Sequence, residues 1–130
     1  MLEAQRMGLN TCWVALTYSK SRSRVSVAAG EKLVCVISLG YGTTQGHSHR
    51  IKGIDKVTKV NGEMPDWFRS GAQAALLAPT AVNQQQFCFT LNADGTVCAR
   101  AKMGFYSKID LGIVKLHFEI GAAPHPVKWQ

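Results

Sequence analysis

Residues 78–87 constrain the fold of this chain most, because a helix must end there and a cluster of uncharged amides begins. The segment reads Ala-Pro-Thr-Ala-Val-Asn-Gln-Gln-Gln-Phe. Proline disfavours helical geometry in the residue before it, so Pro79 stops the helix of small residues that precedes it. Each Asn and Gln that follows offers donors and an acceptor on one amide. Such a cluster suits either a polar loop that satisfies backbone groups or the rim of a planar, polar-edged ligand.

The elements around this segment have clear local signals. Pro65 suits the first position of a helix, where its missing amide hydrogen costs nothing. Residues 86–91 and 96–101 flank Asn92-Ala93-Asp94-Gly95, which predicts an antiparallel hairpin. One face of the helix before Pro79 is small and aromatic, so another backbone or a flat ring can approach it closely: Trp67, Phe68, Gly71, Ala72, Ala75 and Leu76.

A second helix is predicted near the end of the chain. Ser107 and Asp110 have the spacing of a capping box before the apolar run 111–120, and Gly121 closes it. The run is apolar nearly all round, so we expect burial on more than one side. Pro124 and Pro126 then predict an extended tail, which suits lying across a partner subunit.

The first third of the chain reads as the continuation of a larger fold. Residues 2–7 resemble the last turns of a helix that ends at Gly8, without a capping residue at its start. An upstream part is therefore expected to be absent or supplied by another chain. Residues 12–16 and 33–39 are apolar without alternation, which predicts strands covered on both faces.

Two polar stretches complete the pattern. Residues 18–29, with Lys20, Arg22 and Arg24, fit a surface helix or an irregular segment, and the basic run is expected to be a solvated face. Residues 40–62 predict a long surface connection, and long connections in compact domains are often functional. Alternating helices and strands with one hairpin indicate a single α+β domain over residues 1–130, with layered helices and a mixed sheet.

Composition narrows the functional classes. No apolar run approaches the roughly 20 residues that cross a bilayer, and the start lacks a signal-peptide layout, so a cytoplasmic location without a membrane partner is expected. Cys12, Cys35, Cys88 and Cys98 lie in apolar runs without paired spacing, which predicts buried, reduced thiols. The histidines and cysteines lack zinc-ligand spacing, so no metal site is expected.

The charge indicates a phosphate-bearing partner. The formal net charge is +7, and nine of the fifteen Lys and Arg residues lie between Arg6 and Lys59. No recognition-helix or zinc-finger pattern is present, so nucleic acid is the weaker interpretation and a nucleotide cofactor the stronger. Arg50 and Lys52 are the candidate phosphate ligands. His47 and His49 are expected to be solvated, and His117 to be a hydrogen-bonded core residue.

The residues also exclude some chemistry. No set of nucleophile, base and orienting group is present, and no pair of carboxylates is placed for acid–base work, so hydrolase chemistry is unsupported. That pattern is compatible with an enzyme whose cofactor carries the electrons.

Four segments, in this order, resemble one known family. Residues 8–14 resemble its helix-to-strand junction, and residues 33–42 resemble the next strand and its Gly-Tyr-Gly turn. Residues 78–87 resemble its flavin-contacting motif Ala-Pro-Ser-x-x-Asn-x-Gln-Pro, with Thr80 in the Ser place and Gln86 in the last Pro place. Residues 109–121 resemble its late helix. The family is the FMN-dependent nitroreductases, in the TM-nitroreductase branch, and the resemblance covers the later part of such a protein.

The resemblance implies a nitroreductase-like fold, in which FMN lies between two halves or two subunits. It carries ring or ribityl contacts over to Thr80, Asn83 and Gln85, with Pro79 and the face of Gly71, Ala72 and Ala75 as the apolar bed. The family's N-terminal arginine-and-serine phosphate motif is not present, so the chain is expected to be an incomplete copy that works as a homo-oligomer or with a separate N-terminal half.

Two functions follow from these observations. The first is an FMN-dependent oxidoreductase that uses NADH or NADPH to reduce small molecules such as nitroaromatics or quinones. The second is a non-catalytic fragment or partner subunit of the same fold that lacks a complete flavin site. A basic nucleic-acid-binding domain is a third, weaker alternative.

Overall fold

The computed structural model describes residues 1–19, 22 and 25–130, so Lys20 and Arg24 of the basic run lie outside the described residues. The chain separates into two compact units, Met1–His47 and Ser48–Gln130. We describe each unit by itself. The single domain expected from the sequence stays a prediction.

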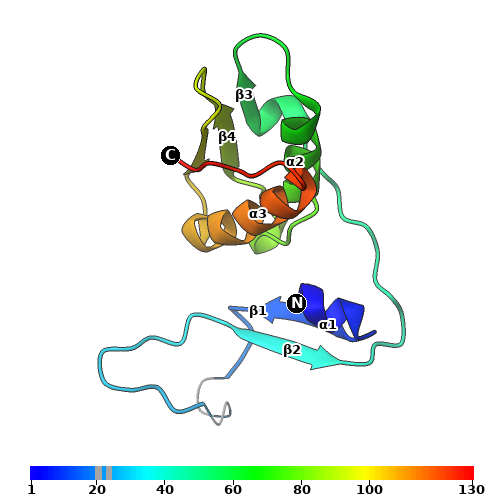
Figure 1. The fold of residues 1–130 in the computed structure, drawn as a ribbon. Helices are drawn as coiled ribbons and strands as arrows, with labels where there is room; N and C mark the ends of the chain where they lie inside the picture. Colours follow the sequence, from blue (N-terminus) through cyan, green and yellow to red (C-terminus); the bar gives the residue numbers. More distant parts are fainter. Residues whose placement is uncertain (20–21, 23–24) are drawn as a thin grey trace. The chain divides into compact units, whose positions relative to one another are not determined.

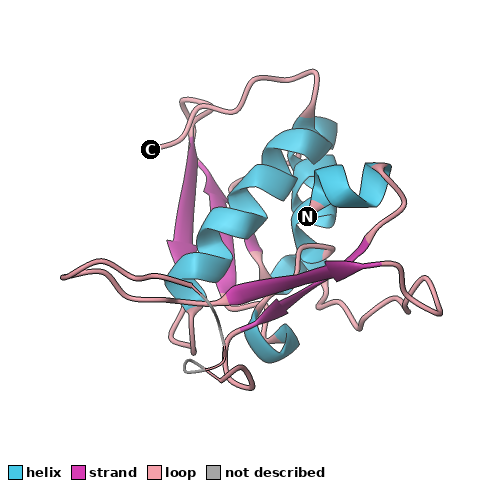
Figure 2. Cartoon of the chain, turned by 90° about the horizontal axis from the view of Figure 1, so that it is seen from below, coloured by secondary structure: helices cyan, strands magenta, loops and turns pink. Residues whose placement is uncertain are grey.

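Unit 1 consists of a short helix and a two-stranded ribbon. Helix α1 (Leu2–Arg6) precedes β1 (Asn10–Val14), which pairs antiparallel with β2 (Val36–Gly40), as Figure 2 shows. The helix ends as predicted, because Gly8 has a φ of 75° that suits glycine. The Gly8 amide donates to the Gln5 carbonyl at 3.0 Å, and the Leu9 amide donates to the Ala4 carbonyl at 2.9 Å. These are the two hydrogen bonds of a Schellman motif.

The strands of unit 1 overlap the predicted ranges 12–16 and 33–39, although β1 begins two residues earlier and β2 three residues later, and their expected burial is wrong. Ile37 is 46% and Leu39 62% exposed. The ribbon has two strands among the described residues and therefore lacks the flanking strands of a buried parallel sheet. The described residues between 18 and 29 form neither a helix nor a strand, which favours the irregular interpretation of that segment.

Unit 2 packs two helices against one mixed sheet (Figure 1). The strand order is β3-β4-β5, with β3 (Thr58–Val60) parallel to β4 (Phe87–Leu91) and β5 (Val97–Ala101) antiparallel to β4. Helix α2 (Asp66–Leu76) connects β3 to β4, and α3 (Ser107–Ala122) follows β5. Two short 3-10 turns, η1 (Ile54–Lys56) and η2 (Ala81–Asn83), precede β3 and β4.

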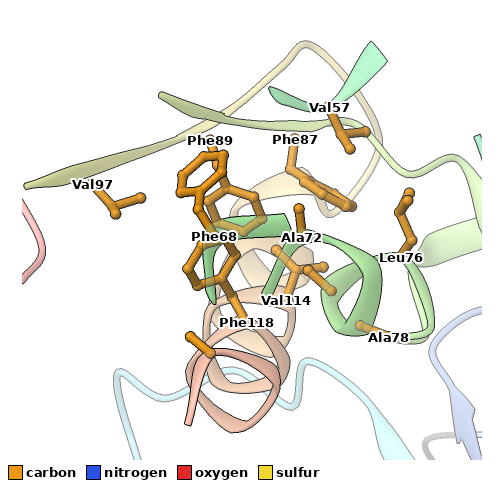
Figure 3. Packing of buried hydrophobic residues seen from close by; sticks show 12 residues of the cluster. Val57, Phe68, Ala72, Leu76, Ala78, Phe87, Phe89, Val97, Val114 and Phe118 are labelled. Atoms are coloured by element: carbon orange, nitrogen blue, oxygen red, sulfur yellow. The ribbon is translucent and has the colours of Figure 1, made fainter. Parts of the chain in front are cut away.

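Aromatic rings fill the core of unit 2 (Figure 3). Phe68 from α2, Phe89 from β4 and Phe118 from α3 are fully buried and lie together between the helices and the sheet. The Phe118 ring centroid is 4.6 Å from that of Phe89 and 5.3 Å from that of Phe68. The predicted apolar face of α2 is therefore confirmed as a core face, with Trp67 half-buried at its edge.

The predicted hairpin is confirmed. Leu91 pairs with Val97, and the Asn92 amide donates to the Thr96 carbonyl at 2.9 Å. The Asp94 carboxylate accepts from the Thr96 hydroxyl at 2.7 Å and from its amide at 3.0 Å. These bonds favour the charged form, so they hold the pKa of Asp94 below its ordinary value.

Helix α3 exists where the sequence predicted it, but its start and end differ. The residue before its first turn is Tyr106, and no side chain caps the helix. The expected capping box is therefore wrong, because Asp110 bonds to a loop instead. Gly121 lies inside the helix, which continues to Ala122.

The expected burial of α3 on more than one side is also wrong. Val114 and Phe118 are fully buried, whereas Leu116 is 51% and Ile120 55% exposed. One side of the helix faces the core of unit 2 and another side does not.

One further expectation needs correction. The connection 40–62 contains η1 and β3, because Val57 and Thr58 bury their side chains beside β4. The lysines around this short run interrupt the apolar pattern by which a strand is recognised in a sequence. The C-terminal tail packs on its own chain: Trp129 bridges to Val97, whose amide donates to the Lys128 carbonyl at 2.8 Å. A contact of the tail with a partner subunit stays a prediction.

The cysteines are reduced in the structure, but only Cys88 is buried. Cys12 is exposed, and Cys35 and Cys98 are half-buried, so burial was predicted too widely. Within the described part of the chain, none of the helices combines the length and apolar character that crossing a membrane requires.

Candidate functional site

The candidate site is the loop between α2 and β4, residues 79–86. Three of its residues have left-handed backbones although none is glycine: Val82 and Gln85 with φ of 46° and Asn83 with φ of 54°. Residues with a Cβ rarely adopt the left-handed region of φ and ψ, so contacts with neighbouring residues must hold the backbone in this conformation. The amide side chains that follow Pro79 provide many of those contacts.

Gln85 is the most deeply buried of these amides, with 2% of its surface exposed. Its Oε1 accepts from the Lys52 backbone amide at 2.8 Å. Its Nε2 donates to the Arg50 carbonyl at 2.7 Å and to Asn83 Oδ1 at 2.7 Å. Both hydrogens and the oxygen of this amide are therefore engaged within the chain.

Lys52 and Asn83 reinforce the same junction. Lys52 Nζ donates to the carbonyl oxygens of Gln84 at 2.7 Å and Gln85 at 3.2 Å. Asn83 Nδ2 donates to the Arg50 carbonyl at 2.9 Å. The backbone of residues 50–52 is thus fastened to the loop by side chains from both segments.

A second set of bonds holds the loop from the side of α3. The Asp110 carboxylate accepts from the Ala81 amide at 3.0 Å (Oδ1) and 3.1 Å (Oδ2), and from Gln84 Nε2 at 2.9 Å. Gln84 Nε2 also donates to the Phe105 carbonyl. Inside the loop, the Thr80 hydroxyl oxygen accepts from the Gln85 amide at 3.0 Å.

The structure brings five of the six predicted site residues into one hydrogen-bonded cluster: Arg50, Lys52, Thr80, Asn83 and Gln85. Pro79 adjoins it and is exposed. The hydrogen bonds of the cluster involve the backbone carbonyl of Arg50, and the Arg50 residue, which carries the guanidinium group, is exposed. Lys52 directs its ammonium group at backbone carbonyls.

The sequence missed Asp110 and Gln84 as members of this cluster. Gln84 stands in the amide run, which was the only signal for it. The sequence pattern assigns Asp110 to the first turn of α3, because its spacing from Ser107 matches a capping box. Contacts between positions 29 and 26 residues apart are not visible in a local pattern.

The expected apolar bed for a ring is wrong for the α2 face. Ala72 and Ala75 are fully buried. A Cβ built on Gly71 would lie 2.9 Å from the Phe118 ring, so α3 occupies this face. The close approach that the small residues allow is made by a phenyl ring and a helix of the same chain.

His47 and His49 are exposed, as the sequence predicts, although His49 also contacts the end of α2. His49 Nε2 lies 3.0 Å from the Leu76 carbonyl oxygen at the end of α2. His117 is half-buried on α3, where burial lowers its pKa and a hydrogen bond to the backbone of Ala74 partly opposes that shift. Among the described residues, no three His, Cys, Asp or Glu side chains are grouped to hold a metal ion.

Comparison with known proteins identifies the class. The family model described as "Putative TM nitroreductase" matches residues 1–122, so the chain belongs to this family. It is similar to the crystal structure of a putative nitroreductase from Thermotoga maritima, with a TM-score of 0.70 and 21% sequence identity. No curated protein matches the chain.

The similarity covers 92% of this chain and 48% of the Thermotoga chain. The fold is thus nitroreductase-like, as the α+β prediction stated, and the chain spans about half the length of that structure. At this level of identity the likeness establishes the fold and not the chemistry.

Proposed function

We propose that this chain provides the flavin-contacting part of an FMN-dependent oxidoreductase that takes electrons from NADH or NADPH and reduces nitroaromatics, quinones or similar acceptors. The family supports an oxidoreductase. The observation that carries the proposal is the preorganised loop 79–85, since the ring-contact residues implied by the family motif lie together there. A flavin site needs ring contacts and a phosphate anchor.

The residues present fit such a group in part. Asn83 is exposed and its Nδ2 donates one hydrogen bond, to the Arg50 carbonyl, so its second hydrogen remains for a ring or ribityl oxygen. The Thr80 hydroxyl accepts one bond through its oxygen and keeps its own hydrogen as a donor. Exposed Pro79 and Val82, the latter 81% exposed, add apolar surface to the same loop.

Two of the predicted ligands take narrower roles in this proposal. The amide of Gln85 is buried and engaged, so it positions Asn83 instead of contacting the ring. Lys52 fastens the loop through its ammonium group. The exposed Arg50 guanidinium is the candidate phosphate anchor, because the Arg50 backbone is held beside the loop by Asn83 and Gln85.

FMN would supply the hydride chemistry when bound. The chain's own residues would orient the ring through Asn83 and Thr80 and attract the phosphate through Arg50. The remaining contacts of the family site are proposed to come from a second copy of the chain or from an N-terminal half.

The first test is retention of FMN. The protein is mixed with excess FMN, freed of unbound cofactor and scanned in the visible range, while light scattering gives its oligomeric state. A retained flavin spectrum supports the proposal, and NADH or NADPH oxidation with a nitroaromatic then tests turnover. A folded but colourless protein contradicts a site built from copies of this chain alone, and leaves either a site that needs an N-terminal half or a non-catalytic subunit.

The second test is Asn83→Leu, with Gln73→Leu as a matched control on the exposed side of α2. Loss of one amide contact is expected to raise the FMN dissociation constant about three- to tenfold. The control is expected to bind as the parent does. Equal affinity in both variants would contradict the assignment of Asn83.

A further inference from the structure

The backbone of the loop 81–85 is unusual because a β-branched residue takes a left-handed conformation at the surface. Val82 has a φ of 46° and is 81% exposed. Left-handed geometry is disfavoured for all residues with a Cβ, and most for bulky or β-branched ones. Packing of the Val82 side chain does not hold this conformation, since most of that side chain is in solvent. Bonds to its neighbours must do so.

Asp110 makes those bonds on both sides of the turn. Its carboxylate accepts from the Ala81 amide at 3.0 and 3.1 Å, immediately before Val82. It also accepts from Gln84 Nε2 at 2.9 Å, immediately after Asn83. The Asp110 carboxylate therefore links the residues before and after the left-handed pair, Val82 and Asn83, to the first turn of α3.

The burial of Asp110 is consistent with a dedicated role. The side chain is 4% exposed, and none of the ion pairs among the described residues includes it. Burying a carboxylate without a cation is costly unless hydrogen bonds compensate for lost water. The Ala81 amide and the Gln84 carboxamide are the groups that supply this compensation.

We propose that Asp110 is a positioning residue that holds residues 81–84 in their left-handed turn and thereby keeps the Asn83 amide at the surface for the flavin. The last step rests on the proposed function. Holding the turn does not, because the bonds are made within the chain alone.

A purely structural role makes a different prediction. Asp110 lies in the first turn of α3, where a negative charge is favourable for the helix dipole. In that case Asp110→Asn would weaken α3 and leave the turn at Val82 unaffected. Asp66 is the matched control, since it is an exposed aspartate in the first turn of α2.

The test uses Asp110→Asn, Val82→Gly and the double variant in the full chain without cofactor. Amide hydrogen exchange at Ala81, measured by NMR, is expected to accelerate about tenfold or more in Asp110→Asn, because a bond to a charged acceptor is lost. Asp66→Asn is expected to leave this exchange unchanged. Unchanged exchange at Ala81 in Asp110→Asn would overturn the proposal.

The urea midpoints of the four proteins supply a second measurement. Glycine removes the cost of the left-handed turn, so Asp110→Asn is expected to shift the midpoint less in the Val82→Gly background than in the parent. Additive shifts would mean that Asp110 does not act on the turn. If Asp110→Asn does not fold, Gln84→Met removes one of the same bonds and is expected to give a smaller acceleration at Ala81.

The flavin step has its own readout. The FMN dissociation constant of Asp110→Asn is expected to rise about tenfold, as for loss of a well-placed contact. If the parent binds no FMN, the proposal that copies of this chain form the flavin site fails, while the coupling between Asp110 and Val82 still stands. If the parent binds FMN and the variant binds equally well, the positioning role toward the flavin is overturned.

Discussion

The side chain of Gln85 donates to the Arg50 carbonyl oxygen at 2.7 Å and so joins two segments 35 residues apart in the sequence. The same amide accepts from the Lys52 backbone amide at 2.8 Å. Two backbone groups of an otherwise irregular connection therefore depend on one buried glutamine. Several measurable effects depend on this and on three other features of unit 2.

Replacing Gln85 by Ala is expected to lower the free energy of unfolding by about 2–3 kcal/mol, because backbone groups of Arg50 and Lys52 lose their buried partner. Urea denaturation followed by circular dichroism measures this. Gln73→Ala, at an exposed position on α2, is the control and should stay within about 0.5 kcal/mol of the parent. Equal effects would show that the buried bonds contribute nothing specific.

Two glycines of α3 should respond to alanine with opposite signs. A Cβ on Gly121 would lie 2.7 Å from the Ser70 carbonyl oxygen and near the Gly71 backbone, so Gly121→Ala should destabilise the chain by about 1–3 kcal/mol. A Cβ on Gly112 meets nothing within 4 Å, so Gly112→Ala should stabilise by about 0.5–1 kcal/mol through helix propensity. Thermal melts of both variants give the signs. The same sign for both would contradict the close packing of α2 on α3.

Removal of the Trp129 side chain should detach the tail. The centroid of the Trp129 ring lies 5.6 Å from that of Phe118, and Lys115 Nζ lies 4.3 Å from the Trp129 centroid. Trp129→Ala is expected to cost about 2 kcal/mol, below the value for a fully buried ring because Trp129 is half-buried. Trp129→Phe keeps an aromatic ring and should lose clearly less. An unchanged urea midpoint in Trp129→Ala would mean that the tail does not pack in solution.

Stability should fall on mild acidification through His117. Burial lowers the folded-state pKa of His117 below its ordinary value of 6.5. The unfolded chain then takes up the proton first, so this contribution is present above the unfolded pKa and is lost as the pH falls toward the folded pKa. The urea midpoint should drop between about pH 7.5 and about pH 5.5, and His117→Gln should reduce that drop. An identical drop in the variant would assign the pH dependence to other groups.

Elements with strong local signals could be predicted from the sequence. Pro79 and the small residues before it define α2, and the turn around Gly95 defines the hairpin, since both depend on residues within one or two turns of each other. Helix α3 was predicted for the same reason. Its first turn was misread because Asp110 satisfies the Ala81 amide, 29 positions away, rather than its own helix.

Features that depend on distant pairing were not predictable. Strand β3 has three residues, and its strand character depends on parallel pairing with β4. The small residues of α2 matched a flat ring as well as another helix, and only the position of Phe118 decides between them. The family motif places Thr80, Asn83 and Gln85 in one short segment, but which amides stay exposed depends on where residues 50–52 run.

The course of the tail also limits how the sheet of unit 2 can grow. Lys128 and Gln130 take up both backbone groups of Val97 that β4 leaves free, at 2.8 and 3.0 Å. Asn92 Nδ2 fixes the end of this tail segment, residues 128–130, by donating to Gln130 Oε1 at 2.8 Å. The beginning of β5 is thereby closed to strand addition from solvent. A protein tag attached after Gln130 would start at a sheet edge. A spacer is therefore needed that leaves the hydrogen bonds between residues 128–130 and Val97 undisturbed.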